Sequence, residues 1–180
     1  MYRIYKSENN GENFEEVAVV PADTKGRAYG SIIFDSNDIL HLYCYNFNLD
    51  HLISRDFGKT WEILESCFVN NGARNPQTVL MDGVYFLHGR TKDRGGFVLY
   101  TSENGSDWDE GTRIENFDYL CGVFYSNNIV LEDENGKFLL IQYSSPYVNR
   151  PLYYSEIDKK YYVATVNVKH VKIRLKKHTE

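Results

Sequence analysis

Arginine is the residue type whose placement in this sequence points most directly to ligand chemistry. Five of the nine arginines lie in segments that join short apolar stretches of the chain: Arg27, Arg74, Arg90, Arg94 and Arg150. A planar guanidinium binds a carboxylate through two parallel hydrogen bonds, so clustered arginines suit an acidic sugar. The alternative is that these arginines are ordinary loop residues that bridge backbone carbonyls or the carboxylates of Asp93 and Asp118.

Two carboxylates, Asp23 and Asp93, lie in the same connecting segments. A pair of carboxylates flanking a sugar suits a glycosidase with acid–base chemistry, whereas most exposed aspartates are solvated loop residues. No glutamate stands out as a catalytic partner.

Metal and cofactor chemistry is not indicated. The sequence has three cysteines: Cys44, Cys67 and Cys121. They form no CxxC pair and are odd in number, so we expect reduced, buried thiols. His41 and His51 lack metal-ligand spacing, and the acidic run at 132–136 lacks the spacing of a calcium loop. We predict no cofactor and no bound metal.

Net charge and hydropathy exclude further classes. The chain has 20 Lys and Arg against 25 Asp and Glu, a net charge of −5, which disfavours nucleic acid as a partner. No apolar run is long enough to span a bilayer. Residues 1–6 lack the apolar stretch of a signal peptide, so we expect a cytoplasmic chain as written, while a longer parent could be secreted.

The elements that must position these residues are strands. The apolar stretches are short, β-branched and aromatic, as in Ile39–Tyr45 and Phe138–Tyr143, and turn signals such as Asp82-Gly83 and Asn104-Gly105 separate them. Many short strands joined by such turns predict an all-β protein built from antiparallel hairpins.

A repeat organises these strands. Ser54–Trp61 reads S-x-D-x-G-x-T-W, and weaker copies occur at Ser7–Phe14 and Thr101–Trp108, with a remnant at Ser155–Tyr162. The spacings are 47, 47 and 54 residues, and a short apolar strand precedes each copy. A period of this length indicates a repeated supersecondary unit.

The residue types of the repeat suit a tight turn between two strands. Asp56 can accept backbone N–H bonds within a tight turn, Gly58 can adopt positive φ, and Trp61 can bury a large side chain at the start of the next strand. We therefore interpret Asp56 as a structural residue, in preference to a catalytic one.

These copies resemble the Asp-box, or bacterial neuraminidase, repeat of sialidase-like β-propellers. In that family the box links the third and fourth strands of a four-stranded blade. The resemblance implies three blades at about 28–66, 73–115 and 122–166. Residues 1–20 would supply the third and fourth strands of another blade, and 168–176 one more strand.

The number of blades is about four, whereas sialidase-like propellers have six and need about 260 residues. Three interpretations remain open. In the first, the chain closes as a four-bladed ring in which the C-terminal strand completes the N-terminal half-blade. In the second it is part of a longer parent, and in the third it is a homo-oligomer that closes the ring by self-association. The basic segment Lys169–Lys177 suits a closing strand on an acidic body, with polyanion binding as the alternative.

The resemblance also predicts where a ligand binds, because propellers bind ligands at the rim opposite the box turns. The arginine-bearing segments fall on that rim. Sialidases hold the sialic acid carboxylate with three arginines from different blades; the segments around Arg74 and Arg150 look like two of these, and Arg27 and Arg90 are further substrate-binding candidates.

For catalysis, retaining sialidases use a Tyr nucleophile paired with a Glu, plus an Asp acid/base. Tyr125 opens an innermost strand and is the candidate nucleophile, although it precedes Arg150, whereas the family's Tyr follows its third arginine. Asp93 is the candidate acid/base.

The function predicted is a sialidase-like glycoside hydrolase, or a glycan-recognising propeller, that acts on an acidic, sialic-acid-type sugar. The alternatives are a non-catalytic carbohydrate-binding or remnant module, and a propeller that binds proteins.

Overall fold

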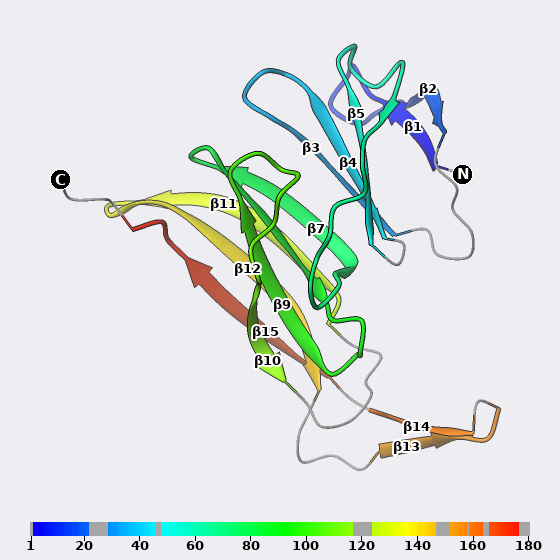
Figure 1. The fold of residues 1–180 in the computed structure, drawn as a ribbon, viewed down its shortest axis with the longest axis vertical. Helices are drawn as coiled ribbons and strands as arrows, with labels where there is room; N and C mark the ends of the chain where they lie inside the picture. The colour runs from blue at the N-terminus through cyan, green and yellow to red at the C-terminus, as the bar shows by residue number, and fades with distance from the viewer. Residues whose placement is uncertain are drawn as a thin grey trace.

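The computed structural model describes residues 2–21, 29–45, 48–116, 124–146, 152–157, 159–163 and 166–176. Throughout these ranges the regular structure is β-strand, and no helix occurs (Figure 1). The all-β prediction is therefore confirmed.

The first sheet contains four strands that follow one another in sequence and in space: β3 (Gly30–Phe34), β4 (Leu40–Tyr45), β5 (Leu49–Ser54) and β6 (Glu62–Ile63). All neighbours are antiparallel. Asp35 closes the first turn, because its Oδ1 accepts the backbone N–H groups of Asn37 and Ile39 at 2.8 Å each.

The second sheet repeats this order with β7 (Arg74–Met81), β8 (Val84–Arg90), β9 (Gly96–Ser102) and β10 (Thr112–Asn116). Its first hairpin turns at Asp82-Gly83, whose φ angles of 50° and 81° are those of the two-residue turn that matches strand twist.

The third sheet differs from the expected blade at 122–166. It pairs β11 (Ser126–Asp133), β12 (Gly136–Pro146) and β15 (Val166–Ile173), while β13 (Leu152–Ser155) and β14 (Lys160–Val163) form a separate hairpin. The C-terminal strand therefore does not complete the N-terminal half-blade, which is the hairpin of β1 (Tyr2–Lys6) and β2 (Glu15–Val20).

Burial and charge explain why β15 takes the place beside β12. Val171 and Ile173 pack into the core between the second and third sheets, and Lys169 Nζ lies 2.5 Å from Glu115 Oε1 on β10. Over Val171–Arg174 the apolar and basic residues alternate, which places Val171 and Ile173 on the face that meets the core and Lys172 and Arg174 on the other.

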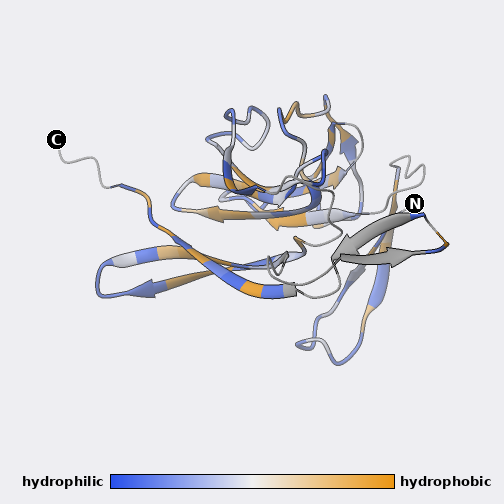
Figure 2. Ribbon diagram, turned by 90° about the horizontal axis from the view of Figure 1, so that it is seen from below, coloured by the Kyte–Doolittle hydropathy of each residue, from blue (hydrophilic) through white to orange (hydrophobic). Residues whose placement is uncertain are grey.

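The sheets stack face to face, with β3, β7 and β11 in contact as the innermost strands. Hydrophobic and hydrophilic residues alternate along the strands (Figure 2).

Three hydrophobic clusters fill the spaces between these layers. The first and second sheets enclose Tyr43, Leu49, Leu87, Val98 and Tyr100. The second and third sheets enclose Phe86, Phe97, Leu139, Ile141 and Tyr143. The β1–β2 hairpin and first sheet enclose Val20, Leu42, Cys44 and Leu52.

The Ser54–Trp61 turn has the structure predicted for it. Asp56 accepts hydrogen bonds from the backbone N–H and the hydroxyl of Thr60, at 2.8 and 2.6 Å, and Gly58 has φ +88°. Trp61 Nε1 donates to the Gly58 carbonyl at 2.9 Å. The motif is a structural clip between β5 and β6.

In the third copy of the repeat, Thr101–Trp108, the residues that make the turn's hydrogen bonds lie one position later than the sequence alignment predicts. Ser102, not Thr101, accepts the glycine N–H, and Asn104 Oδ1 accepts the Ser102 hydroxyl, as Asp56 does from Ser54. The segment from the serine to the glycine is one residue shorter here (Ser102 to Gly105) than in the second copy (Ser54 to Gly58). An alignment of the copies on their glycine and tryptophan does not reveal this difference.

Candidate functional site

The rim predicted to bind a ligand lies where β7 begins and β8 ends. Arg74 and Arg90 stand directly opposite each other in the β7–β8 pair. Arg90 is buried, and the Arg74 guanidinium lies 5.9 Å from the ring centre of Tyr29 at the start of β3. Two arginines are therefore brought together at this rim.

The backbone between these arginines is irregular. The β7–β8 register shifts between Arg74 and Gln77, and Asn75 has a left-handed φ of 56°. Gly89 permits this close approach, because a Cβ there would lie 2.8 Å from the Arg74 carbonyl oxygen. Strain of this kind is typical of functional segments.

Buried polar groups at this irregularity have unused hydrogen-bonding capacity. Asn75 is only 7% exposed, yet neither polar atom of its side chain is hydrogen-bonded within the part of the chain that the structure describes. The same holds for Arg74 Nε. Because an unsatisfied buried polar group costs free energy, such groups mark a place where a polar ligand would be stabilised.

Asp93 belongs to the turn that joins β8 to β9, and its carboxylate is fully engaged. It accepts hydrogen bonds from the Thr91 hydroxyl, the Gly95 N–H at 3.0 Å and Arg113 at 2.8 Å. Burial alone would raise the pKa of Asp93, but these hydrogen bonds outweigh it and lower the pKa to about 2. Asp93 therefore holds no proton to donate at neutral pH.

Tyr125 lies immediately before β11, and its side chain is 56% exposed. Its backbone N–H donates to Ser144 Oγ at 3.0 Å, and its carbonyl accepts from the Ser144 N–H. Arg94 has φ 62° in the Asp93 turn. The remaining candidates, Arg27, Arg150, Asp23 and Asp118, lie outside the described residues.

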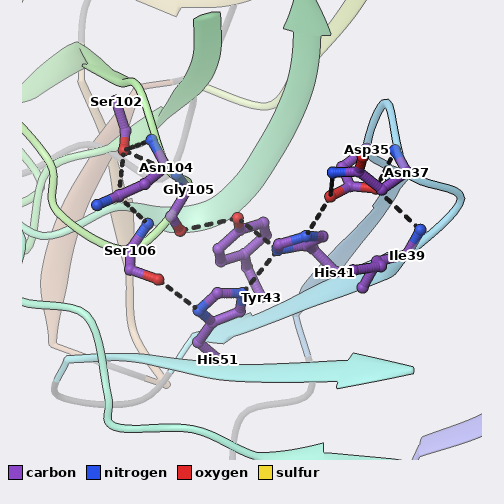
Figure 3. Close-up of polar contacts among 10 residues, drawn as sticks. All are labelled: Asp35, Asn37, Ile39, His41, Tyr43, His51, Ser102, Asn104, Gly105 and Ser106. Carbon is purple, nitrogen blue, oxygen red and sulfur yellow. Dashed lines mark hydrogen bonds and ion pairs between the residues drawn. The ribbon is translucent and has the colours of Figure 1, made fainter. Parts of the chain in front are cut away.

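A second polar cluster lies at the opposite end of the sheets, beside the box turns (Figure 3). His41 Nδ1 and His51 Nε2 are 2.9 Å apart, Ser106 Oγ is 3.4 Å from His51 Nδ1, and Asp35 Oδ2 is 3.6 Å from His41 Nε2. Tyr43 donates to the Gly105 carbonyl at 2.9 Å. The cluster links the first sheet to the box turn of the second.

The nearby Asp35 carboxylate favours one pair of histidine tautomers, although His41 Nε2 makes no hydrogen bond within the described residues. An ionised carboxylate favours a proton on His41 Nε2, which leaves His41 Nδ1 to accept from His51 Nε2–H and His51 Nδ1 to accept from Ser106. Burial lowers the pKa of both histidines, that of His51 to about 4, so the neutral pair is the stable form. A polar cavity of about 410 Å³ lies beside the cluster, lined in part by Arg55, Tyr85 and Glu103.

Sequence spacing did not reveal this cluster. The spacing of His41 and His51 along the sequence suits no metal site and indicates no other contact between them. The signal lies in the β4–β5 register: His41 pairs with Ile53 and Tyr43 with His51, so both histidines point to one face.

Over the residues that the structure describes, no three His, Cys, Asp or Glu side chains gather as a metal site. Cys44 and Cys67 are free and buried, as predicted, and burial raises the pKa of each thiol to about 11. In the same ranges no helix is available to cross a membrane.

No family model and no curated protein matches this chain, whereas solved structures do. The GH93 α-L-arabinofuranosidase of Fusarium graminearum, solved with arabinobiose, is 17% identical with a TM-score of 0.50, over 68% of this chain and 41% of that one. The Penicillium chrysogenum α-L-arabinanase, also with arabinobiose, is 20% identical with a TM-score of 0.50, over 69% and 42%. The NanB sialidase of Streptococcus pneumoniae is 22% identical with a TM-score of 0.56, over 96% and 28%.

At these identities the likeness concerns the fold. The four-stranded antiparallel sheets are blades of a β-propeller, the architecture of these glycosidases. The chain spans less than half the length of each of the three proteins.

Proposed function

We propose that this chain is part of a glycoside-hydrolase-like propeller and that it recognises an acidic sugar at the rim where β7 begins. The observation that carries the proposal is the placement of Arg74 opposite Arg90, beside the buried and unbonded amide of Asn75. The arabinobiose bound by two of the structural neighbours supports a sugar as the ligand.

The chemistry follows from the side chains. A guanidinium at this rim can take both oxygens of a sugar carboxylate, and the Asn75 amide can donate to one hydroxyl and accept from another. Because these groups are largely removed from water, the ion pair is screened less than at an exposed site.

Hydrolysis is the second candidate function, and the exposed phenol of Tyr125 at the start of β11 favours it. The ionised, fully bonded Asp93 argues against that residue as the acid. Turnover of a fluorogenic sialoside, abolished by Tyr125→Phe, would establish the catalytic version; absence of turnover with intact binding would leave recognition alone.

The test of recognition is titration of the protein with a sialylated oligosaccharide by calorimetry. Loss of a charge-assisted contact costs about 1.5–3 kcal/mol, so Arg74→Ala should weaken binding by about 10- to 100-fold. Arg74→Lys should retain charge but lose the paired hydrogen bonds. Arg55→Ala, at the opposite end of the first sheet, is the matched control. Unchanged affinity in Arg74→Ala, with the circular dichroism intact, would disprove the arginine site.

A further inference from the structure

The polar cavity beside the histidine pair lies where the first sheet packs on the second, at the end of the sheets opposite Arg74 and Arg90. Its volume of about 410 Å³ falls within the range of about 300–1,000 Å³ that small-molecule sites occupy. The residues that line it come from the β3–β4 turn, from β4 and β5, from the β7–β8 hairpin and from the box turn that follows β9. A ligand in this cavity would therefore contact both sheets at once.

The inner end of the cavity holds a polar atom without a hydrogen-bond partner. His41 lines the cavity and is only 7% exposed, yet its Nε2 atom makes no hydrogen bond within the residues that the structure describes. Asp35 Oδ2 lies 3.6 Å from this atom, which is too far for a direct hydrogen bond (Figure 3). Because a missing hydrogen bond to a buried group costs free energy, a polar atom that bridges the two would be stabilised.

The Asp35 carboxylate offers an ionised acceptor to such a bridging atom. Its Oδ1 accepts the backbone N–H groups of Asn37 and Ile39, whereas its Oδ2 has a long contact of 3.4 Å from the Asn37 side chain. Burial alone would raise the pKa of Asp35, but the hydrogen bonds outweigh it and lower the pKa below its ordinary value. Oδ2 can therefore accept a further hydrogen bond.

The His41 ring offers a donor from the other side. An ionised Asp35 favours the tautomer pair in which His51 Nε2–H donates to His41 Nδ1, two atoms that are 2.9 Å apart, so the proton of His41 lies on Nε2. The bridging atom must therefore accept a hydrogen bond from His41 and donate one to Asp35. Because Nε2 and Oδ2 are only 3.6 Å apart, one ligand atom has to do both.

A hydroxyl oxygen is the ligand atom that meets this requirement. An ammonium has no acceptor for the His41 proton, and a carboxylate has no proton for Asp35. The charge of the lining also disfavours an anion, because the carboxylates of Asp35 and Glu103 outnumber the single guanidinium, that of Arg55. The cavity thus suits a neutral molecule that carries hydroxyl groups.

We propose that this cavity is a second binding site and that it takes a neutral polyhydroxylated ligand, a sugar ring or a free polyol, with one hydroxyl bridging His41 and Asp35. Further hydroxyls of such a ligand would bond the lining residues Ser36, Asn37 and Glu103. The proposal does not depend on recognition of an acidic sugar at the start of β7, which lies at the other end of the sheets.

The test is a titration of the full chain, followed by NMR of the histidine side chains. The separate probes are methyl β-D-glucopyranoside, methyl β-D-galactopyranoside and myo-inositol. A bound hydroxyl should shift the ring resonances of His41 and His51 until they saturate, whereas His88, buried where the second sheet packs on the third, should keep its own. Saturation by the glycosides alone would identify a sugar ring as the ligand, and saturation by inositol as well would identify polyols in general.

Two ions serve as counter-probes, since each lacks one of the two functions of a hydroxyl. Sodium acetate cannot donate to Asp35, and methylammonium chloride cannot accept from His41, so neither should give a saturable shift. Saturable binding of either ion at this ring would contradict the bridging hydroxyl. If none of the three neutral probes shifts the His41 resonances, water alone fills the cavity and the proposal is wrong.

Asp35→Asn tests the bridge itself. Asparagine can still accept the backbone N–H groups of Asn37 and Ile39 and so keep the turn, but it removes the charged acceptor that faces His41. Loss of a charge-assisted hydrogen bond should weaken binding of the neutral probe by about 10- to 100-fold. Affinity equal to that of the wild type, with an unchanged far-ultraviolet circular dichroism spectrum, would overturn the bridge.

Ser36→Trp tests the cavity without touching the bridge. Ser36 is an exposed turn residue that lines the cavity, so a tryptophan there should fill part of the space and abolish binding. Glu134→Trp, in the exposed turn between β11 and β12, is the matched control and should bind the probe as the wild type does. Undiminished binding by Ser36→Trp would show that the ligand lies elsewhere.

Discussion

The stability of the Ser54–Trp61 turn depends on the charge of one residue, Asp56. Hydrogen bonds from the Thr60 hydroxyl, the Thr60 N–H and the Ser54 hydroxyl lower the pKa of Asp56 to about 2. A carboxyl whose pKa is lower in the folded state stabilises that state above its ordinary pKa near 3.8, and the contribution is lost as the pH falls toward 2.

Asp56→Asn should therefore lower the Tm at pH 7, since a neutral amide accepts the Thr60 bonds less strongly. The difference from the wild type should shrink between about pH 4 and pH 2, where Asp56 itself becomes protonated. Differential scanning calorimetry at several pH values measures this. Asp38→Asn is the control, since asparagine tolerates the φ of 60° at that turn. A Tm difference that is constant with pH would contradict the role of charge.

Sequence reasoning predicted the role of Asp56 because residue types alone determine it. It placed Arg74 at the rim for the same kind of reason. It could not find the left-handed φ of Asn75 or the unbonded amide, because both result from the approach of β8 through Gly89. The chemistry of a side chain follows from its residue type, whereas its burial and the strain of its backbone depend on the neighbouring strand.

At the scale of elements, the turn between β9 and β10 depends on Gly111. Its φ is +76°, and a Cβ at this position would lie 2.3 Å from Cε1 of the buried Tyr100 ring. Tyr100 in turn donates to the Gly72 carbonyl at 3.1 Å and accepts the Asn71 N–H at 3.0 Å. The glycine thus lets the second sheet turn back directly over an aromatic ring that holds the adjacent loop.

Gly111→Ala should destabilise the protein by clearly more than Gly83→Ala. Both positions have positive φ, which costs an alanine about 1 kcal/mol, but a Cβ at Gly83 meets nothing within 4 Å. The clash with Tyr100 adds an overpacking cost of about 1–3 kcal/mol. Urea unfolding of both variants measures the difference. Equal losses would show that the ring moves aside freely.

The strands themselves were largely predictable. The first sheet was expected at Ser31–Asp35, Ile39–Tyr45, Asp50–Ser54 and Thr60–Glu65, close to the observed β3 to β6. The pairing of β12 with β15 was not, because the residues of β13 and of β15 both suit a β-strand. The choice between them depends on contacts such as Lys169 with Glu115, which no local pattern encodes.

At the scale of the whole molecule, buried histidines lie where the first sheet packs on the second (His41 and His51) and where the second packs on the third (His88). Burial lowers the pKa of His88 to about 3 and of His51 to about 4, and lowers that of His41 as well. Groups that resist protonation in the folded state stabilise it above their ordinary pKa near 6.5, and this contribution is lost as the pH falls below that value.

The free energy of unfolding should therefore fall between pH 7 and pH 5, by about 1–2 kcal/mol for each fully excluded proton. His88→Gln should reduce this loss, because an amide can donate to Ser126 and accept from Asn128 without titrating. Urea denaturation at both pH values measures the slope. If the free energy of unfolding of His88→Gln falls between pH 7 and pH 5 as much as that of the wild type, groups other than His88 cause the loss of stability.

The sheet order also bears on how the chain folds. In the first and second sheets each strand pairs with the next in sequence, so these sheets form from contacts of short sequence separation, which favours rapid folding. The third sheet is different, because β15 must find β12 across the segment that contains β13 and β14. Closing a longer loop costs more conformational entropy, so we expect β15 to dock last. Until it does, β12 presents an unpaired edge that can template association with another unfinished chain. Docking of β15 thus covers the edge of β12 and protects this sheet from aggregation.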